Sequence, residues 1–144
     1  MFRGRFEHTI DLKGRLSIPS KFRETLSERY DSRLVLTAYD KCILAYPFAQ
    51  WQALEEKVAG LPEFNKDARA FLRFFYSSAT DCTIDKLGRI LVPPTLRDYA
   101  KLEKDVMLIG ALKHVEIWCK GLWEAEQALH PQDDITNTLA RLGI

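Results

Sequence analysis

The chain has 144 residues, of which 47% are hydrophobic and 28% charged, and its formal net charge is +1. This length excludes several independent domains, and the composition is that of an ordinary globular protein. The charged N-terminus lacks the apolar core of a secretion signal, and the longest apolar run, residues 106–112, is too short to cross a bilayer. We therefore expect a cytoplasmic protein without a membrane partner.

Positive charge is concentrated at the N-terminal end of the chain. Residues 1–23 carry six basic and two acidic side chains, a local charge of +4 that leaves the remainder at −3. A polyanion would meet this end first. The basic residues are Arg3, Arg5, Lys13, Arg15, Lys21 and Arg23.

The sequence contains an internal repeat with an offset of 74 residues. Residues 9–24 match residues 83–98, with identical Thr, Ile, Asp, Gly, Arg, Pro and Arg at equivalent positions. The similarity continues more weakly through the segments that start at Leu34 and Val106. Each copy is predicted to form strand, turn, strand, short helix, strand, turn, strand and a Trp-containing helix.

The first copy opens with the pattern of two half-buried strands. Phe6, His8 and Ile10 alternate with polar residues, and Leu16 and Ile18 then do the same. In both copies the intervening turn has an Asp at its first position and a Gly at its fourth, where Asp accepts backbone N–H groups and Gly tolerates positive φ. These residues are Asp11 and Gly14, and Asp85 and Gly88.

Prolines and apolar periodicity place the helices. Pro19 and Pro93 suit the first turn of a short helix, which in the first copy buries Phe22 and Leu26 over the hairpin. A longer helix is predicted over residues 47–58, with Gly60 as its stop. A second is predicted over residues 65–77, with an apolar side (Phe71, Leu72, Phe75 and Tyr76) and a solvated basic side (Lys66, Arg69 and Arg73).

The C-terminal tail after Pro131 has Ile135, Leu139 and Leu142 at helical spacing. This apolar stripe is equally consistent with packing on the chain's own core and with a contact to another subunit. We divide the chain into a first module (1–60), a connecting helix (61–80), a second module (81–130) and the tail (131–144).

The predicted fold class is α+β, mainly β. Two hairpins and one short helix cannot bury enough apolar surface to be stable alone, so the two copies must pack together. We expect a small pseudo-twofold barrel flanked by helices, in which strand edges are paired.

No pattern of catalytic residues appears. The chain has no phosphate-binding glycine motif and no metal-ligand spacing among its three histidines and three cysteines. Cys42, Cys82 and Cys119 are interpreted as free buried thiols. We therefore predict a protein that is not an enzyme and has no cofactor, metal or small-molecule substrate.

The D-x-x-G-R turn, present twice, is the strongest candidate site. Arg15 and Arg89 begin strands directly after a tight turn and point away from the apolar face. A guanidinium held on a rigid two-stranded ribbon suits bidentate recognition of guanine or phosphate in the major groove. The alternative, taken on spacing alone, is an Asp-to-Arg ion pair that only locks the turn.

The two copies are not expected to contribute equally to DNA binding. Residues 81–97 carry a net charge of only +1, from three basic and two acidic side chains. We therefore predict that Lys13 and Arg15 form the principal double-stranded DNA surface, helped by Arg3, Arg5 and Lys21. Arg89 is predicted to be structural, together with Asp11, Gly14, Asp85 and Gly88.

With these motifs the chain resembles the bacterial MraZ family. The resemblance covers essentially the whole chain and rests on Met1-Phe-Arg-Gly, on Asp11-Leu-Lys-Gly-Arg-Leu-Ser-Ile-Pro with Phe22-Arg23, and on Asp85-Lys-Leu-Gly-Arg-Ile. It also includes Phe71-Leu-Arg-Phe-Phe and Val115-Glu-Ile-Trp. One departure is the last hairpin turn, residues 111–114, which lacks the expected Gly or Asn.

The resemblance implies two SpoVT-AbrB-like modules with swapped hairpins and assembly into a homo-oligomeric ring, an octamer or similar. It also implies a nucleoid-associated regulator of the division and cell-wall gene cluster, which binds short upstream direct repeats through Asp11 and Arg15. A ring would gain affinity by engaging several repeats at once. Two alternatives stay open: an antitoxin-like regulator with the same hairpin fold, and a ring-forming interaction scaffold whose basic end is incidental.

Overall fold

The computed structural model describes residues 1–144 and contains the same series of elements in both copies. The first copy comprises β1 (Arg5–Thr9), β2 (Arg15–Ser17), α1 (Ser20–Arg29), β3 (Arg33–Tyr39), β4 (Cys42–Pro47) and α2 (Phe48–Ala59). After α3 (Lys66–Ser77), the second comprises β5 (Thr80–Thr83), β6 (Arg89–Leu91), α4 (Pro94–Tyr99), β7 (Asp105–Gly110), β8 (Val115–Cys119) and α5 (Lys120–Leu129). The chain ends with α6 (Gln132–Arg141).

The strands form one six-stranded antiparallel sheet and one two-stranded ribbon. The sheet has the order β1-β7-β8-β4-β3-β5, and β2 pairs with β6. Each copy gives a strand to the other, because β1 pairs with β7 and β5 pairs with β3. The α+β prediction is confirmed, but the ladder has two free ends, β1 and β5, and does not close as a barrel. The reason is that β2 and β6 leave the sheet and pair with each other.

The main hydrophobic core lies between the sheet, the ribbon and the two short helices. Leu16 of β2 and Ile90 of β6 are opposite each other and buried. Phe22 of α1 and Leu96 of α4 occupy equivalent buried positions in the two copies. Because one core contains both ribbon strands and both short helices, neither copy could bury these residues without the other.

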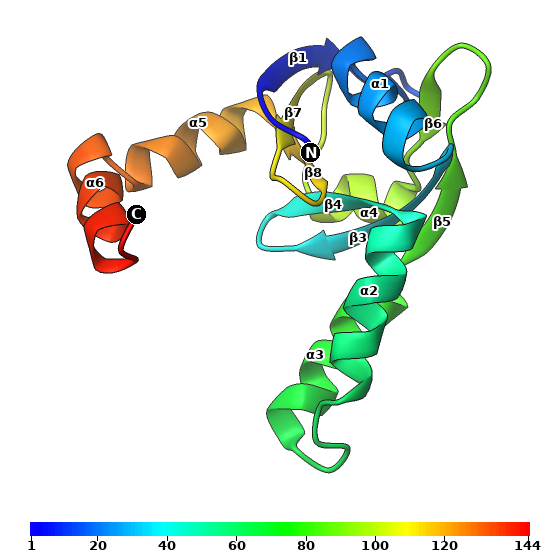
Figure 1. Ribbon diagram of the computed structural model, residues 1–144. Coiled ribbons are helices and arrows are strands. Elements are labelled where there is room, and N and C mark those ends of the chain that lie inside the picture. The colour runs from blue at the N-terminus through cyan, green and yellow to red at the C-terminus, as the bar shows by residue number, and fades with distance from the viewer.

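A second cluster lies where α2 and α3 leave the body as a helical arm (Figure 1). Trp51 of α2 stacks on Phe75 of α3 with ring centroids 5.5 Å apart. The buried Thr37 hydroxyl donates a hydrogen bond of 2.7 Å to the Phe75 carbonyl and so ties the arm to β3. The apolar and basic sides predicted for residues 65–77 are confirmed, since Lys66, Arg69 and Arg73 are exposed.

Helix α6 buries none of its residues in the core of the chain. All residues from 131 to 144 are exposed, and α5 and α6 extend away from the sheet (Figure 1). Of the two alternatives for the tail, packing on the chain's own core is therefore wrong. Ile135 and Leu139 remain 49% and 42% exposed.

In the last hairpin turn, residues 111–114, Leu112 adopts the backbone conformation that a glycine would favour. Leu112 has a φ of 70°, in the left-handed region that side chains rarely adopt. Its N–H and carbonyl both form 2.9 Å hydrogen bonds with Phe2, which is buried. The N-terminal segment therefore holds Leu112 in this conformation.

None of the six helices has the length and apolar character that a membrane span requires.

Candidate nucleic-acid interface

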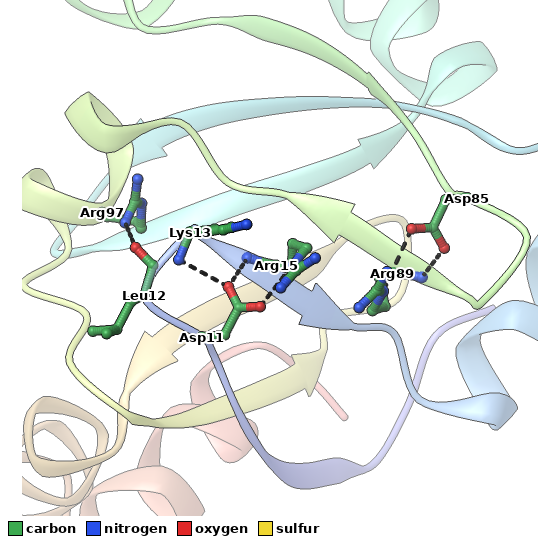
Figure 2. Close-up of polar contacts among 7 residues, drawn as sticks. All are labelled: Asp11, Leu12, Lys13, Arg15, Asp85, Arg89 and Arg97. Atoms are coloured by element: carbon green, nitrogen blue, oxygen red, sulfur yellow. Dashed lines mark hydrogen bonds and ion pairs between the residues drawn. The ribbon is translucent and has the colours of Figure 1, made fainter.

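The ribbon, β2 and β6, presents one buried and one outward face. Leu16 and Ile90 point into the core. Side chains alternate along a strand, so their neighbours share the other face: Arg15 and Ser17 from β2, and Arg89 and Leu91 from β6. We call residues 11–15 the first turn and residues 85–89 the second turn. Because the strands are antiparallel, the two turns lie at opposite ends of the ribbon (Figure 2).

The first turn is organised around the Asp11 carboxylate. One oxygen, Oδ1, accepts backbone N–H groups from Lys13 at 3.0 Å and Arg15 at 2.9 Å. The other, Oδ2, accepts the Arg15 Nε–H at 2.6 Å. Hydrogen bonds from the Arg15 backbone and side chain lower the pKa of Asp11 below its ordinary value. Gly14 closes the turn with a φ of 91°.

Asp11 therefore orients the Arg15 side chain, and the rest of the guanidinium remains free to bind a partner. Its side chain is 42% exposed, and only its Nε is bound by Asp11. The two terminal Nη groups make no hydrogen bond within the chain, and these are the atoms a guanidinium uses for bidentate contacts. The Asp-to-Arg ion pair weighed as an alternative does exist, yet it leaves these donors free.

The second turn repeats the backbone pattern with a looser side-chain contact. Asp85 Oδ1 accepts the N–H groups of Leu87 at 2.8 Å and Arg89 at 3.0 Å, and the Arg89 backbone bond is the main cause of a lowered Asp85 pKa. Arg89 Nε, however, lies 3.5 Å from Asp85 Oδ2 and is buried without a hydrogen bond. The Arg89 side chain is 30% exposed, less than that of Arg15.

Two arginines that the sequence analysis left without a role brace the turns from the opposite copy. Arg23 of α1 donates from Nε to the Ile18 carbonyl at 3.1 Å and lies against the second turn at Gly88. Arg97 of α4 donates from Nε to the Val92 carbonyl at 3.1 Å and lies against the first turn at Gly14. The sequence does contain a signal for these two residues, because Arg23 and Arg97 are identical at equivalent positions of the repeat.

The other predicted basic residues lie apart from the first turn. Arg5 lies over the ring of Trp123, 5.6 Å from its centroid. Arg3 and Lys21 line a hollow of about 450 Å³ beside α1, which also contains Glu24 and Glu28. No hydrogen bond or ion pair joins Arg3, Arg5 or Lys21 to residues 11–15. Lys13 alone shares the first turn with Arg15.

The cysteines are not paired with one another. Cys42 is buried, whereas Cys82 and Cys119 are only partly buried, so the prediction of buried thiols holds fully for one of the three. Burial raises the pKa of the Cys82 thiol to about 12 and also raises that of Cys42. Neither thiol is therefore a ready nucleophile at neutral pH.

A family model matches the chain twice, over residues 1–74 and 75–142, and carries the description "MraZ protein, putative antitoxin-like". This chain belongs to the MraZ family. The MraZ match covers both copies of the repeat, and so agrees with the internal duplication that the sequence and the matching element order reveal.

Curated MraZ relatives align along the chain's length. A protein of Desulfitobacterium hafniense (strain DSM 10664 / DCB-2) is 47% identical over 146 residues, covering all of both chains. One from Pelotomaculum thermopropionicum is 48% identical over 147 residues, covering 100% of this chain and 99% of the relative. One from Thermoanaerobacter sp. (strain X514) is 52% identical over 125 residues, covering 86% and 85%. Each of these relatives is named a transcriptional regulator.

Proposed function

We propose that this chain is a sequence-specific, double-stranded DNA-binding transcriptional regulator. The observation that carries the proposal is the first turn, where Asp11 fixes Arg15 through Nε while both Nη groups stay free on the outward face of the ribbon. A guanidinium held in this way loses little conformational entropy on binding, and its two Nη groups can still donate a bidentate pair of hydrogen bonds. The names of the MraZ relatives point in the same direction.

In this proposal the ribbon enters the major groove with the first turn leading. Arg15 contacts a guanine edge or a phosphate through its Nη groups, and Lys13 beside it contacts the backbone. Arg3, Arg5 and Lys21 contribute outlying phosphate contacts rather than base recognition, since they lie away from the first turn. Arg89 remains structural, because its Nε is buried and its side chain is less exposed.

The finer organisation is part of the same proposal. The exchange of β1 and β5 between the copies supports two swapped-hairpin modules of the SpoVT-AbrB type, over residues 1–60 and 81–130. We propose that several copies assemble into a ring, an octamer or similar, in the cytoplasm at the nucleoid. The ring would bind short direct repeats upstream of the division and cell-wall gene cluster. Several weak ribbons acting together would offset the small net charge of each chain.

One observation favours a second candidate, an interaction scaffold. Helix α6 exposes Ile135, Leu139 and Leu142 and has no buried residue. Exposed apolar stripes of this kind commonly mark protein contacts. A scaffold would bind DNA weakly or not at all, and any binding would not depend on base sequence.

Fluorescence anisotropy separates the two candidates. A labelled duplex from upstream of the protein's own gene is titrated with the wild-type protein, alongside a scrambled duplex of equal composition, at two salt concentrations. The regulator predicts tighter binding to the upstream duplex and a steep fall in affinity with salt, because phosphate contacts release counterions. Equal affinity for both duplexes, or no binding, would reject the regulator in favour of the scaffold.

A further inference from the structure

We propose that Arg97 is a positioning residue that holds the first turn in its DNA-reading shape from the other copy of the repeat. This inference rests on the proposed function. Arg97 makes two contacts at once. Its Nε donates to the Val92 carbonyl at 3.1 Å. Its Nη1 donates to the Leu12 carbonyl at 3.4 Å, the contact drawn in Figure 2. The second bond is long, but it reaches into the first turn itself.

The backbone of the first turn leaves space for this guanidinium. A Cβ at Gly14 would come within 2.9 Å of Arg97 Nε and 2.6 Å of the Val92 carbonyl oxygen. Val92 N–H in turn donates to the Gly14 carbonyl at 2.8 Å. Glycine is thus needed at position 14 both for its φ and because Arg97 and Val92 lie against it.

Helix α4 fixes the base of the Arg97 side chain. Leu96 and Ala100 are 2% and 0% exposed, so the helix is anchored in the core on both sides of Arg97. The contact therefore joins a rigid part of the second copy to the exposed turn of the first. The second copy, whose hairpin carries a net charge of only +1, thus has a role in this proposal. It holds in place the turn of the first copy that contacts DNA.

Arg23 provides a matched control at the equivalent position of the first copy. Its Nε also donates to a carbonyl at 3.1 Å, that of Ile18, and it lies against Gly88 as Arg97 lies against Gly14. It braces the second turn, however, and makes no hydrogen bond to residues 85–88. Replacing either arginine removes the same local bond to a carbonyl five residues earlier, but only Arg97 also bonds to the turn that carries Arg15.

The test compares Arg97→Lys and Arg97→Gln with Arg23→Lys and Arg23→Gln. Binding to the upstream and scrambled duplexes is measured for each, with thermal unfolding to match stability. Lysine keeps the charge but lacks the planar fork. We expect Arg97→Lys to reduce the preference for the upstream duplex about tenfold, as for one lost base contact, without changing the salt dependence. Arg23→Lys should retain the wild-type preference.

The outcomes separate the two proposals. If wild-type protein shows no preference between the duplexes, the proposed function fails. If wild type is selective and both Arg97 variants keep that selectivity, the positioning role is rejected. A reduced salt dependence in Arg97→Gln but normal selectivity in Arg97→Lys would instead make Arg97 a phosphate contact and would also overturn the inference.

A measurement on the wild-type protein keeps the inference testable even if the variants fold poorly. In NMR spectra of the free protein, the Arg97 Nη hydrogens should be protected from fast exchange with solvent, because Nη1 donates to the Leu12 carbonyl. Fast exchange of these hydrogens, as in a free guanidinium, would contradict the contact with the first turn.

Discussion

The two turns at the ends of the ribbon have the same D-x-x-G-R sequence and the same backbone hydrogen bonds, but they differ in how the arginine is held. In the first turn Arg15 Nε lies 2.6 Å from Asp11, and in the second turn Arg89 Nε lies 3.5 Å from Asp85 and is buried. Arg15 is also the more exposed side chain. The two copies therefore share the turn, but Arg15 is more available to a binding partner than Arg89. The positive charge near the first turn is also larger than that near the second.

The largest effect on stability is expected from valine at the turn glycines. Gly14→Val would force a β-branched residue to a φ of 91° and place its Cβ 2.6 Å from the backbone oxygen of Val92. We expect a loss of about 3 kcal/mol in the free energy of unfolding. Gly88→Val meets only the flexible side chain of Arg23 and should cost about 1–2 kcal/mol for backbone strain.

Urea unfolding monitored by circular dichroism measures both values. Equal losses in the two variants would show that the first turn is no more tightly packed than the second.

Asparagine at the two aspartates should separate turn geometry from arginine orientation. Both Asp11→Asn and Asp85→Asn keep an oxygen for the backbone N–H groups, but they lose the charge that attracts the arginine. We expect Asp11→Asn to weaken binding to the upstream duplex several-fold and Asp85→Asn to leave it close to wild type. Anisotropy titration measures this difference, and equal weakening would assign the second turn a direct part in binding.

The carboxylates of Asp11 and Asp85 both have lowered pKa values, but the contribution of the neighbouring arginine side chain differs. Both pKa values are lowered, so the stabilisation they provide is present above their ordinary value of 3.8 and is lost as the pH falls through the lowered folded-state values. The hydrogen bond from the Arg15 side chain is the second-largest cause of the lowered Asp11 pKa, whereas the charge and the side-chain hydrogen bond of Arg89 are the two smallest causes of the lowered Asp85 pKa.

Arginine removal should therefore change the two titrations unequally. Arg15→Ala should raise the pKa of Asp11 clearly, and Arg89→Ala should raise that of Asp85 less. NMR titration of the side-chain carboxyl carbons measures both shifts. A larger shift at Asp85 would reverse the order of the two ion pairs.

The smallest effect on stability is expected far from both turns, at α6. Deleting residues 131–144 removes no buried residue, so the free energy of unfolding of the single chain should fall by less than about 1 kcal/mol. Thermal unfolding measures this, and sedimentation of the same variant reports whether α6 contacts another copy. Loss of the ribbon's fold on deletion would show that stability depends on the tail.

Much of the fold could be predicted because the repeat and the local patterns agree. The alternation around Leu16, the prolines before α1 and α4, and the apolar stripe of residues 65–77 each place an element where the structure has it. The turn chemistry of Asp11 and Gly14 was equally legible, because both residue types serve one backbone geometry.

Contacts between the copies could not be predicted from local pattern. Nothing in the spacing of residues indicates that β1 pairs with β7, that the six strands remain open, or that Arg97 reaches Leu12 across 85 positions. The charge count likewise grouped Arg3, Arg5 and Lys21 with Arg15, but it could not show that Arg5 lies over Trp123 or that Arg3 and Lys21 line a hollow beside α1. Charge along the sequence is a poor guide to charge in space.

The most direct test of the first turn as the DNA-reading surface is the pair Arg15→Ala and Arg89→Ala, titrated side by side against upstream and scrambled duplexes. Both remove one partly exposed arginine from the same face of the ribbon, and thermal unfolding of each variant separates a loss of binding from a loss of fold. We predict that Arg15→Ala loses roughly 10- to 100-fold in affinity for the upstream duplex, and with it the preference over scrambled DNA. Arg89→Ala should keep that preference. Retained selectivity in a folded Arg15→Ala protein, or equal losses in both variants, would contradict the assignment of the first turn as the reading surface.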